Sequence, residues 1–526
     1  MITKLKEKFL KIKNWIKEHK KEFIILCLIL LIGAFVRLYK IDQYMTFLSD
    51  EGRDVITVRR LLTKGDLILL GPGTSIGDMY LGPIYYYMMA PALLLANFSP
   101  VGPAVMIALL GVATIFFTWY VARLWFPDKD EKKINWGALI ASTLYAVSST
   151  VVIYSHSSWN PNMMPFFALL CIYSLWKIWK EEKYKWLIVL FISFAVTLQS
   201  HYLALLLAPT IGVFLLLTLI KVKREKIELK GFLKNLLIGI ILFVLLMSPL
   251  VIFDARHNWM NFSSIKKFFT YRETTVSIKP WKALPNIWPL VEQISARLIA
   301  GRNDLAGKIV AWGLLIGSVF VGIKIWKKKV KLLTSPYFLL FTWLGFALIG
   351  LGVYKQHIYD HYFGFFFPAP FILLAGISQN LIESFKKIGG TLVAIIFVLL
   401  LGVSLLDNPF RYHPNKQLQR AQNIAQEVLK IAGGEKFNFA AIAKTNSEMG
   451  YEYFFEVNNS APLHIDATKM KETLTDQLIV VCELPKDECA PLTNNRPEVT
   501  AFGPAEIANT WEKDGLVIYK LIHKKI

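Results

Sequence analysis

Two adjacent carboxylates follow the first long apolar run of the chain and could perform acid–base chemistry. Asp50 and Glu51 stand in the sequence SDEGRD (residues 49–54), directly before apolar residues at helical spacing. A carboxylate within hydrogen-bond reach of a hydroxyl group can act as a general base. The same residues suit a helix start equally well, because serine caps helices and acidic residues in the first turn complement the helix dipole.

Arginine and histidine side chains stand in other loops between apolar runs. Arg256 and His257 could clamp a phosphate, because a guanidinium group binds phosphate oxygens bidentately. An arginine that extends to lipid headgroups is the alternative. His201 and His361 also end apolar runs, where a buried polar group requires a partner or a water-filled cavity. His357 precedes His361 by four residues, but without an HExxH-type glutamate this spacing is weak support for a metal site.

Aromatic and amide side chains occur in the same loops. The sequence YLGPIYYY (residues 80–87) follows the acidic pair, and SHSSWNPN (residues 155–162) joins two apolar runs through an Asn-Pro break. Taken alone, each is typical of an ordinary interfacial loop or polar turn. Taken together with the acidic pair, they predict a substrate cleft lined by Arg53, Tyr85, Trp159, Asn160, Tyr202 and Tyr362.

The composition identifies the environment that holds these residues. Of the 526 residues, 54% are hydrophobic and 18% are charged, and the mean hydropathy is +0.43. Soluble domains carry about 25% charged residues. The composition therefore excludes a cytosolic enzyme and a disordered protein, and it predicts an all-α polytopic membrane protein.

Apolar segments near the length of a bilayer span, about 20 residues, recur through the first four fifths of the chain. We predict about eleven spans, at residues 23–39, 103–125, 134–154, 161–179, 184–198, 203–220, 231–253, 306–326, 335–354, 363–382 and 388–406. Residues 1–22 form a basic N-terminus with eight lysines and no evident cleavage site, which favours an uncleaved first span.

Lysine clusters predict the orientation of these spans. The clusters occur in alternate loops between the predicted spans, at residues 177–185, 221–234, 324–331 and 386–387. The positive-inside rule places them and the N-terminus in the cytoplasm of a plasma (inner) membrane protein. If residues 83–95 crossed the membrane, every later cluster would be external, so we expect this segment to lie on the outer surface or to re-enter. All the candidate site residues then lie outside.

Three parts follow from this organisation: the cytoplasmic N-terminus (residues 1–22), a transmembrane module (residues 23–407) with an external loop (residues 41–101), and an external domain (residues 408–526). The last part consists of short, polar elements and has no long apolar runs. It shows a helical pattern at residues 417–431 and strand-like patterns at residues 437–443, 477–484 and 516–522. We therefore predict a small external α/β domain.

The external domain contains two cysteines. Cys482 and Cys489 are external in this topology, where a disulfide is chemically permitted, and we favour a bond between them. Two unconnected thiols are the alternative.

Common nucleotide-binding and hydrolase signatures are missing from the sequence. It has no Walker P-loop, no GxGxxG fingerprint and no GxSxG elbow, and no cytoplasmic segment is large enough to bind a nucleotide. The energy for any reaction must then enter from the lipid or from the external side. The acidic pair, the phosphate-clamp candidates and the aromatic loops point to a lipid-phosphate-linked substrate.

The arrangement resembles a known family. An Asp-Glu pair after the first span, the GPIYYY sequence (residues 82–87), short alternating cytoplasmic loops and a terminal external domain resemble the GT-C membrane glycosyltransferases. The resemblance extends over residues 23–406 and is closest to the bacterial dolichyl-phosphate-mannose-protein mannosyltransferase-like group, which includes the aminoarabinose lipid A transferases. It implies that a sugar moves from a polyprenyl-phosphate donor to a glycan, lipid or protein acceptor on the outer face, usually with inversion.

The resemblance also implies residue roles. Asp50 would deprotonate the acceptor hydroxyl, and Glu51 would position the acceptor or the base. The donor phosphate would be bound by Arg256, His257, His201 and His361. Many relatives have His-Pro-Pro or Glu-Lys-Pro where residues 81–83 read Leu-Gly-Pro, so a metal ligand is missing here. The sequence therefore assigns no cofactor and leaves a divalent metal open.

A transporter or flippase and a receptor are the alternatives to a glycosyltransferase. A transporter or flippase would also have many spans, but it should show paired broken helices, mid-membrane polar residues and internal repeats. A receptor would leave the one-sided polar loops without a function. The net charge of +21 is explained by topology and anionic headgroups, so we expect no nucleic-acid partner.

Overall fold

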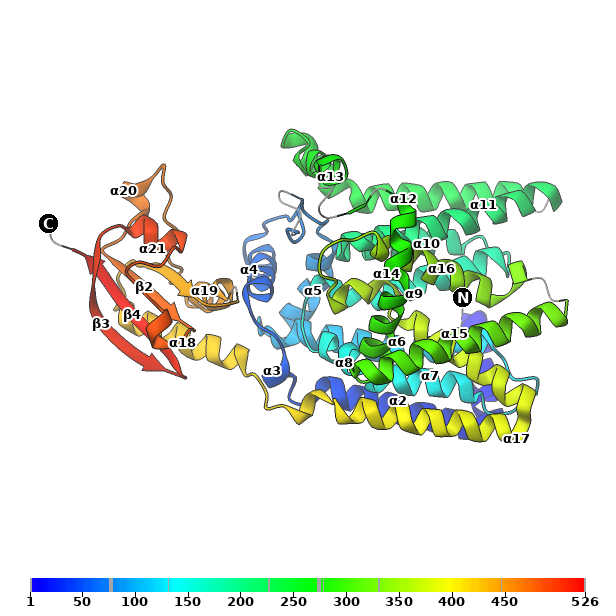
Figure 1. The fold of residues 1–526 in the computed structure, drawn as a ribbon. Helices are drawn as coiled ribbons and strands as arrows, with labels where there is room; N and C mark the ends of the chain where they lie inside the picture. The colour runs from blue at the N-terminus through cyan, green and yellow to red at the C-terminus, as the bar shows by residue number, and fades with distance from the viewer. Residues whose placement is uncertain are drawn as a thin grey trace.

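A helical bundle and a small α/β domain form the two ends of an elongated molecule (Figure 1). The computed structural model describes residues 2–74, 79–130, 132–225, 228–271, 276–277, 279–329, 332–445 and 447–524. Three helices of the loop that follows the first bundle helix lie between the two ends. They are α3 (Ile41–Tyr44), α4 (Ser49–Lys64) and α5 (Ile84–Leu95).

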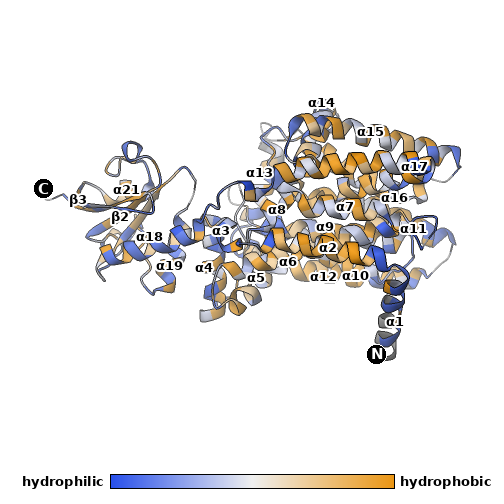
Figure 2. Cartoon of the chain, turned by 90° about the horizontal axis from the view of Figure 1, so that it is seen from below, coloured by the Kyte–Doolittle hydropathy of each residue, from blue (hydrophilic) through white to orange (hydrophobic). Residues whose placement is uncertain are grey.

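Apolar residues predominate along the helices of the bundle (Figure 2). Its helices are α2 (Lys20–Leu38), α6 (Val101–Trp125), α7 (Trp136–Val147), α8 (Ser149–Ser155), α9 (Met164–Trp179), α10 (Trp186–Ser200), α11 (Leu207–Glu225), α12 (Leu229–Arg256), α14 (Leu284–Ile294), α15 (Asp304–Lys327), α16 (Pro336–Gly352) and α17 (Pro368–Leu406). In α12 only 6% of the most apolar window is buried inside the protein. Such a helix is stable where its outer face contacts lipid rather than water.

The number of membrane spans can be compared with the prediction. Among the described residues, five helices are long and apolar enough to cross a membrane, or six if the bent pair α7–α8 is one span. Each of the eleven predicted segments falls on helical structure, but α9, α10 and α16 have only 16, 15 and 17 residues. The count of eleven therefore stays a prediction.

Two helices of the bundle are interrupted. Lys386 has φ 49° and ψ −120°, so α17 consists of two helices joined between the segments predicted as separate spans. The axes of α7 and α8 differ by 58°. The fully buried Arg37 donates hydrogen bonds near this bend, to the carbonyl of Ala146 at 2.8 Å and to Ser155 Oγ at 3.3 Å. These contacts stabilise the bend that leads into the loop at Trp159.

Helix α5 lies at the end of the bundle that faces the C-terminal domain (Figure 1). It has 12 residues, which at 1.5 Å per residue give about 18 Å, well short of a bilayer core of about 30 Å. One side of α5 packs on α4 and another on α6. Its length agrees with the expectation that residues 83–95 do not cross the membrane.

The C-terminal domain contains a four-stranded sheet in the order β1-β2-β4-β3. The strands are β1 (Asn438–Ile442), β2 (Gln477–Cys482), β3 (Ala505–Lys513) and β4 (Leu516–His523); β1 and β2 are parallel, and the other pairs are antiparallel. Helices α18 (Gln417–Ala432) and α19 (Glu448–Val457) share a core with one face of the sheet, and α21 (Pro497–Phe502) shares a core with the other. Strand β3 was not predicted, because its side chains are mostly exposed and polar.

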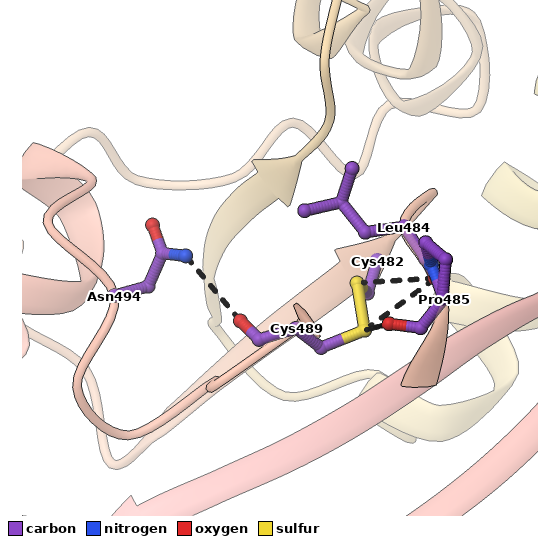
Figure 3. The surroundings of a disulfide bond; sticks show 5 residues. All are labelled: Cys482, Leu484, Pro485, Cys489 and Asn494. Carbon is purple, nitrogen blue, oxygen red and sulfur yellow. Dashed lines mark hydrogen bonds between the residues drawn. A yellow bond between two sulfur atoms is a disulfide. The ribbon is translucent and has the colours of Figure 1, made fainter. Parts of the chain in front are cut away.

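A disulfide closes a short loop at the end of β2 (Figure 3). Cys482 and Cys489 are bonded, with 5.9 Å between their Cα atoms, and both side chains are buried. Asn494 donates a side-chain hydrogen bond to the Cys489 carbonyl at 3.3 Å. The disulfide and this bond hold the loop against the domain, in the pairing that the sequence favoured.

Candidate active site

Helix α4 carries the acidic pair and begins at Ser49, which is its first helical residue and not the capping residue that the sequence suggested. The capping residue is Leu48, whose backbone N–H donates to Glu51 Oε2 at 3.1 Å. Glu51 is buried, and burial raises the pKa of its carboxyl to about 7. The structure therefore places Glu51 at the helix start, where it satisfies a backbone donor, and it does not line the cavity described below.

Arg53 joins two carboxylates with different surroundings. Its Nη1 contacts Asp50 Oδ1 at 2.9 Å, and its Nη2 contacts Asp54 Oδ1 at 2.8 Å. The Asp50 side chain is 50% exposed, whereas the Asp54 side chain is fully buried. Tyr86 donates its hydroxyl hydrogen to the same Asp54 oxygen at 2.9 Å. Asp54 therefore anchors Arg53, and Arg53 holds the exposed carboxylate of Asp50.

The pKa values within this group follow from burial and charge. Burial raises the pKa of Asp54 to about 6, although the Arg53 charge and the bonds from Arg53 and Tyr86 lower it. Burial by itself would lower the pKa of Arg53, but the neighbouring Asp54 carboxylate outweighs it and raises the pKa above its usual value. Arg53 is therefore a permanent cation beside Asp50.

Asp50 lines a cavity of about 280 Å³, which we call the aspartate cavity. Eight predicted site residues meet in its wall: Asp50, Arg53, Trp159, Asn160, His201, Tyr202, His361 and Tyr362. Six other lining residues were not predicted: Pro72, Gly73, Thr74, Leu81, Pro161 and Tyr359. Segments far apart in the chain thus contribute to one wall.

Imidazole and aromatic rings form one side of the aspartate cavity. The Trp159 and His361 rings are 4.6 Å apart, and His201 stacks on Tyr202 at 4.4 Å. Burial lowers the pKa of His201 to about 3 and that of His361 to about 4. Both imidazoles are therefore neutral at neutral pH and would meet a phosphate without a positive charge.

The tautomer of His201 follows from its hydrogen bond. Its Nδ1 accepts the backbone N–H of Leu203 at 3.2 Å, so the proton of the neutral ring resides on Nε2. Asn160 is oriented by a hydrogen bond from its Nδ2 to the Ser200 carbonyl at 2.6 Å. His201 thus has an N–H group to donate to a ligand instead of a positive charge.

A backbone hairpin that follows α4 brings Pro72, Gly73, Thr74 and Leu81 to the cavity. The N–H of Gly71 donates to the Leu81 carbonyl at 2.8 Å, and a Cβ at Gly71 would lie 2.1 Å from the carbonyl oxygen of Gly82. Asn261 Oδ1 accepts the N–H of Tyr80 at 2.6 Å, which ties the hairpin to α13 (Met260–Tyr271). In the sequence, Gly71 and Gly82 were the residues that could have indicated this close approach of the backbone.

Besides Glu51, three predicted site residues lie outside the lining of the aspartate cavity. Arg256 and His257 are exposed at the end of α12, and the His257 ring stacks on Phe253 at 3.8 Å. Tyr85 is fully buried and its hydroxyl lies 2.6 Å from Ser158 Oγ, so it supports the wall from behind. Arg256 and His257 are thus absent from the lining of the cavity that contains Asp50.

A second cavity of about 620 Å³ adjoins the first, and we call it the lysine cavity. Its lining includes Lys282, Lys355 and His357, with the amides of Asn286, Gln293 and Gln356. Tyr354 of this cavity lies 5.9 Å from the Tyr362 ring, and His357 lies 4.6 Å from the Tyr359 ring. Both lysines occur in segments predicted to be external. Because lysine is less common in external loops, their position could have identified them as candidate site residues.

Metal ligation was left open by the sequence. In the part of the chain that the structure describes, no group of three or more histidine, cysteine, aspartate or glutamate side chains could hold a metal ion. The aspartate cavity contains one carboxylate and two imidazoles, but they do not form such a group. We therefore assign no residue to a metal.

Comparisons with known proteins agree with the resemblance. Residues 81–253 match the family described as dolichyl-phosphate-mannose-protein mannosyltransferase. The comparison with curated proteins gave no match.

Solved structures match over nearly the whole chain. The crystal structure of ArnT from Cupriavidus metallidurans bound to undecaprenyl phosphate is 13% identical, with a TM-score of 0.57 over 95% of this chain and 97% of that chain. The archaeal oligosaccharyltransferase AglB from Archaeoglobus fulgidus, in complex with an inhibitory peptide and a dolichol-phosphate, is 12% identical, with a TM-score of 0.53 over 89% of this chain and 70% of that chain. The predicted resemblance to the GT-C, mannosyltransferase-like group is confirmed, and the chain has the fold of a multi-pass membrane protein of this class.

Proposed function

We propose that this protein is a membrane glycosyltransferase that moves a sugar from a polyprenyl-phosphate donor to an acceptor on the outer face of the membrane. One observation carries the proposal: the exposed Asp50 carboxylate, held by Arg53, lines a cavity walled by aromatic rings and neutral imidazoles. The similar structures of ArnT and AglB contain undecaprenyl phosphate and a dolichol-phosphate. A lipid-linked donor for this chain agrees with that similarity.

In the proposed reaction, Asp50 is the general base. The acceptor hydroxyl oxygen attacks the anomeric carbon of the donor sugar while Asp50 takes the hydroxyl proton. The bond between the anomeric carbon and the phosphate oxygen breaks, and polyprenyl phosphate leaves with the electron pair. A direct displacement of this kind inverts the anomeric centre. His201 donates its Nε2–H to the sugar or to the leaving phosphate.

The donor phosphate is assigned to the lysine cavity. Lys282 and Lys355 provide positive charge beside the aspartate cavity, where they would bind the donor phosphate through charge-assisted hydrogen bonds. Arg256 and His257, the first candidates, lie outside both cavity linings.

The sugar is proposed to be neutral. Among the described lining residues of the aspartate cavity, Asp50 is the only carboxylate, and it is already paired with Arg53 at 2.9 Å. A cationic amino sugar would therefore meet an arginine instead of an unpaired acid. Aromatic rings such as Trp159 offer apolar faces against which a neutral pyranose ring can pack.

The test compares wild type with Asp50→Asn in lipid bilayers. The assay measures the release of polyprenyl phosphate from a panel of polyprenyl-phosphate sugars, with cell-envelope extract as the acceptor. Because general acid–base catalysis contributes about 10²- to 10⁴-fold, we expect kcat to fall by at least about 100-fold.

Asp66→Asn is the matched control, because Asp66 is an exposed acid in the same external loop and does not line the aspartate cavity. Its turnover should equal that of wild type. Equal turnover in Asp50→Asn and wild type would remove Asp50 from the reaction. If no donor turns over in wild type, the alternative of a transporter or flippase gains support.

A further inference from the structure

The C-terminal domain touches the helix that carries Asp50 through backbone atoms. A Cβ built on Gly52 would lie 2.3 Å from the carbonyl oxygen of Met449 and 2.5 Å from the backbone nitrogen of Gly450. These are backbone atoms of α19, so they cannot rotate away as a side chain would. Only glycine at position 52 permits this approach of α4 and α19, which lie side by side in Figure 1.

A hydrogen bond beside this contact sets the register of the two helices. The N–H of Met449 donates to Ser49 Oγ at 3.1 Å, one residue before Asp50. A Cβ on Gly450 would meet the carbonyl oxygens of Phe47 and Leu48 at 3.5 Å, an ordinary van der Waals distance. The two glycines therefore face the same contact, but only Gly52 has no room for a methyl group.

Other contacts extend along α4 from this point. Phe47 packs against the rings of Tyr453 and Phe454 at 6.2 Å and 5.9 Å. At the other end, Glu456 accepts from Arg59 at 3.2 Å and from Arg60 at 2.7 Å. The buried apolar residues of α4, α5, α18 and α19 form one continuous cluster. The domain is thus packed against α4 over most of its length.

We infer that the C-terminal domain is a positioning element of the reaction and that Gly52 is a positioning residue, an inference that rests on the proposed function. Helix α19 fixes the first turn of α4 on one side, while Tyr86 of α5 holds Asp54 on the other. The Asp50 carboxylate therefore lies where both contacts place the turn. Alanine favours a helix more than glycine does, so Gly52 is explained by this contact and not by helix formation.

The experiment compares Gly52→Ala with Gly450→Ala in the full-length protein in lipid bilayers. Each variant adds one methyl group to the same contact, but only the methyl at position 52 must displace backbone. Hydrogen–deuterium exchange of residues 49–56 should increase in Gly52→Ala and stay at the wild-type level in Gly450→Ala. A misplacement of about 1 Å can cost about 100-fold in rate, so we expect kcat of Gly52→Ala to fall between about tenfold and 100-fold.

A split between kinetic constants separates positioning from general loss of structure. The donor KM of Gly52→Ala should stay within about threefold of wild type, because neither cavity lining contains Gly52. Unchanged kcat or unchanged exchange in Gly52→Ala would overturn the inference, as would equal effects in Gly450→Ala. If Gly52→Ala does not fold, Glu456→Gln weakens the far end of the same contact. It should then increase exchange in α4 and lower kcat at constant donor KM, and no change in either would overturn the inference.

The result is distinguishable from a failure of the proposed function. If wild type turns over no donor, the glycosyltransferase proposal fails, while the exchange data still decide whether α19 holds α4. If wild type is active, Asp50→Asn is inactive and Gly52→Ala is normal, the proposed function survives and the positioning role of the domain is refuted.

Discussion

Replacing Arg53 by methionine should destabilise the protein mainly through Asp54. Arg53 pairs with Asp54 at 2.8 Å and with Asp50 at 2.9 Å, and methionine removes the cation from both. Asp54 is fully buried, and its Oδ2 has no hydrogen-bond partner among the described residues. After the substitution, the hydroxyl of Tyr86 is the remaining contact to Oδ1 in the described structure.

The expected size of the effect follows from the exposure of each pair. Removing one partner of a buried ion pair costs about 3–5 kcal/mol. The Arg53 side chain is 32% exposed, so we take the lower end, about 3 kcal/mol, for its pair with Asp54. The pair with Asp50 is half exposed on the carboxylate side and adds at most about 1 kcal/mol.

The effect should depend on pH with a defined sign. Burial raises the pKa of Asp54 in the folded protein from its ordinary value near 4 to about 6. The folded state thus favours the protonated form of Asp54. The free energy of unfolding therefore decreases as the pH rises from 4 to above 6. At about 1.4 kcal/mol per pKa unit, the loss is about 3 kcal/mol. Without Arg53 the pKa of Asp54 rises further, so the loss extends to higher pH.

The assay is thermal unfolding in detergent, followed by tryptophan fluorescence between pH 5 and pH 8. Arg60→Met is the matched control on the same helix, because Arg60 is half exposed and its partner Glu456 keeps Arg59. Arg53→Met should unfold at a clearly lower temperature than Arg60→Met at pH 8, and the gap should narrow toward pH 5. The second substitution Asp54→Asn should restore much of the stability, because a neutral amide requires no cation.

Equal midpoints for Arg53→Met and Arg60→Met at pH 8 would refute this reasoning. A difference between the two unfolding temperatures that does not change with pH would also refute it, since the lost stability would then come from packing rather than from a buried charge. A double variant no more stable than Arg53→Met would identify the aliphatic stem of Arg53 as the stabilising part.

Two further predictions concern the lysine cavity and the disulfide. Lys282→Gln and Lys355→Gln should each raise the donor KM about tenfold in saturation kinetics with little change in kcat, because a charge-assisted hydrogen bond contributes about 1.5–3 kcal/mol; unchanged KM values would place the phosphate elsewhere. Replacing Cys482 and Cys489 together by serine should lower the unfolding free energy of the C-terminal domain by about 2 kcal/mol, because the bond spans seven positions and closes a short loop. Denaturant unfolding measures this loss, and an unchanged midpoint would contradict it.

Some features of the fold could be predicted because they depend on local patterns. Apolar runs near the length of a bilayer and helical spacing after Ser49 are properties of neighbouring residues, and the predicted segments fall on helices. The small α/β domain was predicted from alternation in its strands, whereas β3 was missed because its side chains are exposed and polar. The break in α17 at Lys386 also falls between two predicted segments.

The candidate site could be predicted only in part. Polar and aromatic residue types in the external loops identified eight residues that share the aspartate cavity. The sequence did not separate Asp50, which is half exposed, from Glu51, which is buried one position later. It also placed His201 and His361 among the phosphate-binding residues, but it could not report that burial keeps both rings neutral.

By itself the sequence determined the membrane class, the helical segments and the polar loops between them, because hydropathy and periodicity act over a few turns of chain. Only the tertiary structure decided that Arg256 is absent from the lining of the aspartate cavity, that Lys282 and Lys355 line a neighbouring cavity, and that Gly52 meets Met449 almost 400 residues later. These relations depend on how distant segments pack, and close packing is set by the three-dimensional fit of whole helices rather than by any local pattern.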